Sequence, residues 1–123
     1  MRWRTSRTGE PDSHLAGLLT GLDLIVWAAD VDDRRLTYVS DGCRLLSGHG
    51  PEAWLSAAGY AVGLVDAADR TWVTEALERI AGGDDREELE YRLETANGET
   101  VWVANTVHAV TGPDGRRELR GVI

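Results

Sequence analysis

The last third of the chain, residues 87–123, constrains the fold most, because its pattern is that of antiparallel strands joined by tight turns. In the segment 89–94, apolar and charged residues alternate with the period of a half-buried strand. Asn97-Gly98 follows, and this pair is a strong hairpin signal because both residues tolerate positive φ. The sequence therefore predicts a β-hairpin here.

A third strand is predicted after this hairpin. The segment 100–111 is apolar or small on both faces except at Asn105 and His108, which is typical of a central strand covered on both sides. Pro113-Asp114-Gly115 predicts a second turn, and residues 117–123 return as the last strand.

The register of the hairpin decides which side chains face the core, because a slip of one residue inverts every side chain. A two-residue loop places Leu93 opposite Trp102, whereas a three-residue loop with a bulge at Gly98 places Leu93 opposite Val101. We prefer the second register, because one face is then almost wholly apolar. That face carries Leu89, Tyr91, Leu93, Val101, Val103, Asn105 and Val107. The other face carries Glu90, Arg92, Trp102, Ala104, Thr106 and His108.

Composition restricts the class of protein. The 123 residues suffice for one domain with a core. The formal net charge of −8 argues against nucleic acid as a partner, because phosphates attract the opposite charge. No apolar run approaches the roughly 20 residues of a membrane helix, so this segment is expected to make no membrane contact. The lone Cys43 excludes an internal disulfide and suits a reducing cytoplasm, the predicted localisation.

The N-terminal part is predicted to be a flexible lead over residues 1–12 and a helix over residues 13–22. Apolar residues recur in the helix at i, i+3, i+4 and i+7, which gives one apolar stripe. The stripe consists of Leu15, Leu18, Leu19 and Leu22. A short helix of this kind is not stable alone, so we expect it to pack on this domain or on a partner.

The middle of the chain predicts two strands and three helices. The strands are 24–29 and 36–40, the short helices are 41–46 and 52–55, and the longest helix is 69–81. Residues 57–65 show no clear period and are expected to form a loop. The simplest arrangement is an α+β fold, in which a five-stranded antiparallel sheet has helices on one face and the N-terminal helix on the other.

Three local strings together resemble the PAS domain family. Residues 38–52 are similar to its strand-then-helix stretch ending in Gly-Tyr, a spacer and Glu, with His49 at the Tyr position. Residues 65–70 are similar to its His-Pro-x-Asp-Arg helix start, with Asp66-Ala67 in place of His-Pro. The third set is the most specific, because residue types and spacings match together. It consists of Glu90-Tyr91-Arg92-Leu93, Asn97-Gly98, Trp102-Val103, Asp114-Gly115 and Gly121.

The resemblance implies that residues 23–123 form a PAS domain cut at its C-terminal end, because the Asp-Ile-Thr tripeptide that usually follows is missing. It implies a sensor module, not an enzyme, within a larger signalling protein such as a histidine kinase, a cyclic-dinucleotide enzyme or a transcription regulator. Such modules bind small molecules between the sheet and the helices. They often form homodimers, through which a signal would reach the output domain of the same polypeptide.

The expected site residues follow from this resemblance and from the apolar inner face. The ligand pocket is predicted to involve Trp27, Ala29, Leu46, Leu77, Ile80, Tyr91, Leu93, Val103, Asn105 and Leu119. The dimer or outer face is predicted to involve Leu15, Leu18, Leu19, Leu22 and Trp102. A filled core would instead give a pure dimerisation or interdomain module without a ligand. A small stand-alone enzyme is the third hypothesis, but few polar groups are available for catalysis.

No metal or cofactor is expected, and the sequence does not name a ligand. The three histidines, His14, His49 and His108, show no metal-ligand spacing. The string that begins at Cys43 looks like the flavin-binding string of light-sensing LOV domains. It precedes Gly48-His49, however, whereas the LOV string follows the equivalent element. Cys43 is therefore predicted to be a small buried hydrophobe, and the longest helix offers no histidine for haem.

Overall fold

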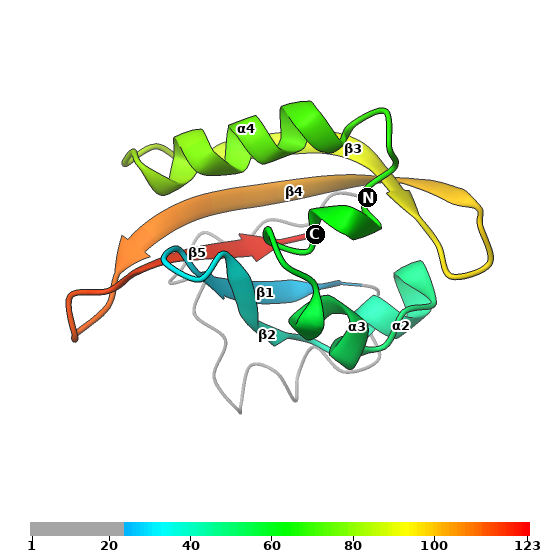
Figure 1. Cartoon of the computed structure of the whole chain (residues 1–123), viewed down its shortest axis with the longest axis horizontal. Helices are drawn as coiled ribbons and strands as arrows, with labels where there is room; N and C mark the ends of the chain where they lie inside the picture. Colours follow the sequence, from blue (N-terminus) through cyan, green and yellow to red (C-terminus); the bar gives the residue numbers. More distant parts are fainter. Residues whose placement is uncertain (1–23) are drawn as a thin grey trace.

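Five antiparallel strands form one sheet in the order β2-β1-β5-β4-β3 (Figure 1). The structure is a computed structural model that describes residues 24–123. The predicted lead and N-terminal helix, with Leu15, Leu18, Leu19 and Leu22, lie outside the described residues. The strands are β1 (Val26–Asp30), β2 (Arg35–Val39), β3 (Glu87–Glu94), β4 (Thr100–Thr111) and β5 (Arg117–Val122).

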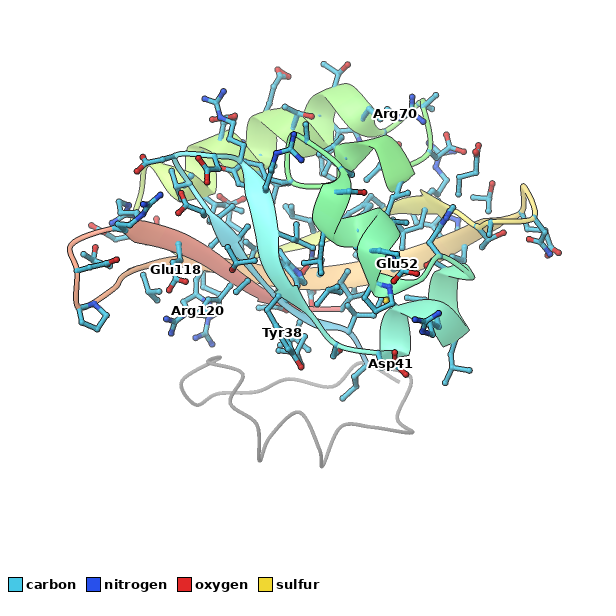
Figure 2. All side chains as sticks on the ribbon, turned by 60° about the horizontal axis from the view of Figure 1, so that its bottom comes forward. Tyr38, Asp41, Glu52, Arg70, Glu118 and Arg120 are labelled. Carbon is cyan, nitrogen blue, oxygen red and sulfur yellow. The ribbon has the colours of Figure 1, made fainter. Side chains whose placement is uncertain are left out.

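The helices that the structure describes lie on one face of this sheet. They are α2 (Gly42–Ser47), α3 (Pro51–Ser56), the short 3₁₀ helix η1 (Val62–Leu64) and α4 (Arg70–Ala81). Figure 1 shows α4 lying along β3 and β4. Arg70 projects on the helix side, whereas Tyr38, Glu118 and Arg120 lie on the opposite face of the sheet (Figure 2). The predicted α+β architecture is confirmed, except that the expected loop over residues 57–65 contains η1.

The hairpin between β3 and β4 has the predicted register. Leu93 pairs with Val101, and the loop closes with a hydrogen bond from the Thr95 amide to the Glu99 carbonyl of 2.7 Å. Gly98 has a φ of 85°, a conformation that glycine adopts without steric strain. The predicted inner face is buried apart from partly buried Val101, and Trp102 on the other face is 66% exposed.

Helix α4 buries the side chains that its periodicity predicts, namely Val73, Ala76, Leu77 and Ile80. Its N-cap residue, Asp69, makes no capping hydrogen bond with its side chain. Asp41 likewise precedes α2 without capping it. Helix α2 ends at Gly48, which has a φ of 77°, and α3 begins with Pro51, where a proline needs no amide partner.

The pairing of β1 with β5 places Trp27 opposite Gly121. A Cβ atom added at Gly121 would lie 2.4 Å from the Trp27 ring atoms Cε2 and Nε1. The indole therefore occupies the space that any larger residue at position 121 would need. This close approach explains why a glycine stands within a central strand, where it otherwise weakens the sheet.

Gly121→Ala is expected to lower the free energy of unfolding by about 1–3 kcal/mol, because the Trp27 indole must move. Urea unfolding followed by circular dichroism measures this change. Gly63→Ala is the matched control, because no atom lies within 4 Å of its added Cβ; we expect it to change stability by less than about 0.5 kcal/mol. Equal effects of the two substitutions would contradict this account of Gly121.

Candidate ligand site

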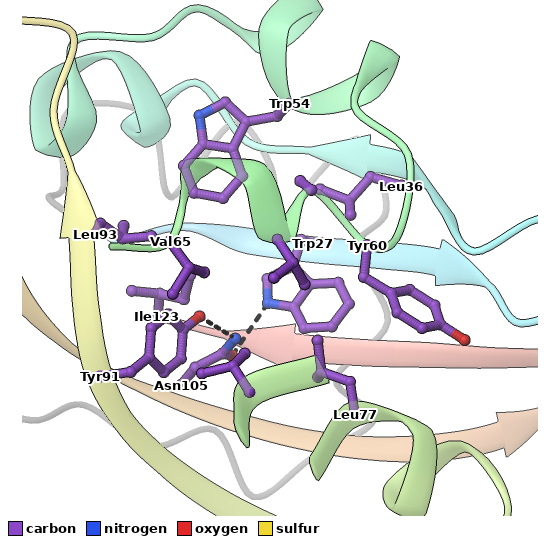
Figure 3. Close-up of a pocket in the computed structure, with 13 residues that line it drawn as sticks. Trp27, Leu36, Trp54, Tyr60, Val65, Leu77, Tyr91, Leu93, Asn105 and Ile123 are labelled. Atoms are coloured by element: carbon purple, nitrogen blue, oxygen red, sulfur yellow. Dashed lines mark hydrogen bonds between the residues drawn. The ribbon is translucent and has the colours of Figure 1, made fainter. Parts of the chain in front are cut away.

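A small cavity lies between the sheet and the helices (Figure 3). Its volume is about 20 Å³, counted as the space that the centre of a water molecule can occupy, and this is enough for one water molecule. Its lining is mostly apolar, with five side chains that carry an N–H, O–H or C=O group. The lining residues are Trp27, Leu36, Trp54, Tyr60, Ala61, Val62, Val65, Val73, Leu77, Tyr91, Leu93, Asn105 and Ile123.

Three buried polar side chains from three strands form a hydrogen-bonded chain at this cavity (Figure 3). The Trp27 indole N–H of β1 donates to Asn105 Oδ1 of β4 over 3.1 Å. The Asn105 amide Nδ2 donates to the Tyr91 hydroxyl oxygen of β3 over 3.0 Å. Two side chains therefore satisfy the buried Asn105 amide.

This chain leaves hydrogen-bonding capacity unused. The Tyr91 hydroxyl accepts from Asn105, and no acceptor for its own proton is found within residues 24–123. Burial raises the pKa of Tyr91 to about 12, so the hydroxyl keeps its proton at neutral pH. Asn105 also carries a second amide proton. The cavity can therefore donate hydrogen bonds to a small guest.

The Tyr60 hydroxyl is a further polar group in the lining. Its oxygen is buried and has no hydrogen-bond partner in the part of the chain that the structure describes. Burial raises the pKa of this hydroxyl above the ordinary tyrosine value. Tyr60 is not among the predicted pocket residues, because residues 57–65 are expected from the sequence to form a loop. The apolar run from Tyr60 to Val62 is the sequence signal that could have indicated burial.

The predicted pocket residues fall into three groups. Those that line the cavity are Trp27, Leu77, Tyr91, Leu93 and Asn105. Four more, Ala29, Ile80, Val103 and Leu119, are buried in the same core but do not line the cavity, because they pack within the layer between sheet and helices. Leu46 is only partly buried and lines a surface groove beside the β3–β4 loop.

The lining residues that sequence reasoning missed come mainly from the connection between α3 and α4. Trp54 lies on a helix too short to show a period, and its indole N–H donates to the Ser47 hydroxyl over 3.3 Å. Val65 forms an isolated β-bridge with Leu93, which a local pattern does not reveal. Leu36, Ala61, Val62, Val73 and Ile123 complete the missed set.

The helix side is tied to the outer face of the sheet by an ion pair between Asp69 and Arg92. The Arg92 guanidinium donates to both Asp69 oxygens, over 2.7 and 2.9 Å, and its backbone amide donates over 3.0 Å. On the outer face, the same guanidinium lies 5.3 Å from the centre of the Trp102 ring. On the helix side, the Trp72 indole donates to Asp69, and its ring meets Tyr91 edge-on at 6.3 Å.

The structure also places Cys43 and the candidate metal ligands. Cys43 is fully buried, as predicted, and burial raises the pKa of its thiol. Within residues 24–123, no group of three or more His, Cys, Asp or Glu side chains could hold a metal ion. None of the helices described is long and apolar enough to cross a membrane.

Asp69→Asn is expected to destabilise the protein more at neutral pH than at acid pH. Hydrogen bonds from Arg92 hold the pKa of Asp69 below its usual range. A carboxyl whose pKa is lowered by folding stabilises the fold above its unfolded pKa, about 3.9. This contribution disappears as the pH falls through the lower, folded-state pKa.

Urea unfolding at pH 7 and pH 3 checks this prediction. The stability difference between the native sequence and the variant should be larger at pH 7. Asp85→Asn, at an exposed position, is the matched control and should show no such change. The same loss of stability at both pH values would show that the charge of Asp69 does not stabilise the fold.

Known proteins resemble this chain in family and fold. The PAS fold family model matches residues 36–123. The N-terminal domain of a diguanylate cyclase with a PAS/PAC sensor from Marinobacter aquaeolei is 22% identical, with a TM-score of 0.71. The match covers 80% of this chain and 91% of that chain. No curated protein matches the chain.

Two further solved structures share the fold. A sensory box histidine kinase/response regulator from Burkholderia thailandensis is 18% identical, with a TM-score of 0.63, and the match covers 90% of this chain and 83% of that chain. The PAS-B domain of Drosophila melanogaster Cycle, with bound ethylene glycol, is 11% identical, with a TM-score of 0.66 and coverage of 79% and 94%. The family model matches most of the chain and the fold agrees, so this protein belongs to the PAS fold family.

Proposed function

We propose that this PAS domain is the cytoplasmic sensory module of a larger signalling protein and that it senses a small molecule in the cavity between the sheet and the helices. The Tyr91 hydroxyl proton and the second Asn105 amide proton, for which residues 24–123 offer no acceptor, carry this proposal, because both groups line a mostly apolar cavity. Similar folds in a diguanylate cyclase and a histidine kinase support a kinase or cyclase as the output domain.

The cavity restricts the chemistry of the ligand. Its space of about 20 Å³ holds one water molecule, so a guest should have only a few non-hydrogen atoms, and the lining must move to admit it. The ligand should carry a hydrogen-bond acceptor, because the Tyr91 hydroxyl offers a proton. A neutral, small, polar molecule fits both conditions. Ethylene glycol bound to the PAS-B domain of Cycle is a molecule of this class.

A second function is favoured by the same small volume. Ligand pockets usually measure about 300–1,000 Å³, far more than this cavity. In this second function, the domain has a filled core, binds no ligand and acts only as a dimerisation or interdomain module. Binding of a small probe to the cavity distinguishes the two functions.

Ethylene glycol is expected to shift the NMR signal of the Trp27 indole N–H, because this group lines the cavity and donates to Asn105. Tyr91→Phe should weaken binding by about 2- to 10-fold, the effect of one lost hydrogen bond. Tyr38→Phe is the matched control, because Tyr38 lies on the opposite face of the sheet (Figure 2). No shift at molar ethylene glycol would favour the filled core.

The outer face of the sheet is proposed to join two copies of the chain. Trp102 is 66% exposed there, and Val26 and Val122 form a second apolar cluster with Leu24 and Tyr38. The leucine stripe over residues 15–22 is proposed to share this interface. Val26 and Val122 are themselves buried, whereas Trp102 is not. Burying one leucine contributes about 1.5–3 kcal/mol, so burial of the stripe together with Trp102 would favour the proposed dimer.

Sedimentation of the intact chain should give about twice the monomer mass of 13.4 kDa. Trp102→Glu, or Leu18→Glu with Leu22→Glu, should shift the protein toward the monomer, because each places charge in the proposed interface. Thr71→Glu, at an exposed position on α4, is the control and should leave the mass unchanged. A native chain that sediments as a monomer would contradict the proposed dimer.

A further inference from the structure

Three successive residues in one wall of the cavity have left-handed backbone conformations. Gly59, Tyr60 and Ala61 have φ values of 66°, 62° and 61°. Glycine adopts this conformation freely, but a side chain with a Cβ atom is strained in it. Tyr60 and Ala61 therefore store conformational energy that contacts elsewhere must offset.

The contacts that hold this segment come from the turn between β1 and β2. The Tyr60 amide donates to the Arg34 carbonyl over 2.6 Å, and Arg34 is itself left-handed, with a φ of 54°. The Arg34 guanidinium pairs with the Glu78 carboxylate of α4 through contacts of 2.9 and 3.1 Å. Arg34 thus links the strained segment to the longest helix.

Tyr60 adds a second strain at its hydroxyl, which lies close enough to the Arg34 side chain for this charge to oppose the larger effect of burial on the pKa. Its side chain is only 6% exposed, and its hydroxyl has no hydrogen-bond partner among the described residues. A buried hydroxyl without a partner is unfavourable, because water would satisfy it. Movement of Tyr60 outward would give the hydroxyl this partner and release the left-handed backbone at the same time.

The segment lacks strand pairing, and the Arg70 guanidinium donates to its Gly63 carbonyl over 3.1 Å. Tyr60, Ala61 and Val62 line the cavity, but Cβ atoms added at Gly59 and Gly63 would meet nothing within 4 Å. The amides of residues 62, 64 and 65 donate hydrogen bonds of 2.9–3.3 Å to carbonyls three positions earlier in the chain. The opposite wall consists of paired strands.

We propose that residues 59–64 form the gate of the cavity and that the Arg34–Glu78 ion pair is its latch. In the closed state, Tyr60 and Ala61 remain left-handed and Tyr60 fills one end of the cavity. In the open state, Tyr60 turns toward solvent and its hydroxyl binds water. The use of this gate for ligand entry rests on the proposed function, whereas the opening itself does not.

Amide hydrogen exchange measured by NMR tests the gate without any ligand. The amides of Val62, Leu64 and Val65 should exchange through local opening, faster than the amides of β1 and β5, which require global unfolding. Glu78→Gln weakens the latch and should speed exchange in residues 62–65 by about 2- to 5-fold. Ala61→Gly removes the left-handed strain from the closed state, so hydrogen exchange in residues 62–65 should become slower by a similar factor.

Ala57→Gly is the matched control, because Ala57 has an ordinary φ of −78° and glycine gains nothing there. Exchange of residues 62–65 at the rate of the β1 and β5 amides would overturn the gate. Equal effects of Ala61→Gly and Ala57→Gly would also overturn it. Because exchange needs no ligand, a failure of ethylene glycol to bind contradicts the proposed function alone.

Discussion

The Asn105 side chain is the polar centre of an otherwise apolar interior, and the arrangement around it depends on both of its hydrogen bonds. It joins Trp27 on β1, which is 78 positions away in the chain, to Tyr91 on β3, which is 14 positions away. Loss of either bond leaves a buried polar group unpaired, which lowers the free energy of unfolding by about 1–3 kcal/mol. The Trp27 indole can occupy this position only because Gly121 has no side chain.

The same sheet carries the two faces that a sensor needs, because successive residues of a strand point to opposite sides. On β3, Tyr91 lies in the cavity and its neighbour Arg92 reaches the outer face beside Trp102. Asp69 holds Arg92 from the helix side and also accepts from Trp72, which packs on Tyr91. A change at the cavity and a change at the proposed dimer face therefore share one set of contacts.

The two ends of the cavity differ in how they are held. Around Asn105, hydrogen bonds join side chains on the strands of one sheet, and only the Tyr91 hydroxyl proton and one Asn105 amide proton have no acceptor within the described chain. At the other end, the Tyr60 backbone is left-handed and its hydroxyl has no hydrogen-bond partner among the described residues. The Arg34 carbonyl, which accepts from the Tyr60 amide, and the exposed Arg34–Glu78 ion pair hold this end in place. The difference between the two ends agrees with the proposed function, in which one end selects a guest and the other admits it.

Local patterns in the sequence were enough to predict the main helix and the C-terminal strands. The alternation in 89–94, the turn at Asn97-Gly98 and the stripe of α4 predicted the strands, the register and the buried helix face, because each depends on neighbouring residues. Tertiary structure alone decided that Asp69 binds Arg92 instead of capping α4, that Trp27 satisfies Asn105, and that the segment around Tyr60 is buried. These features depend on residues distant in the chain, whose contacts form only when the sheet and helices pack together.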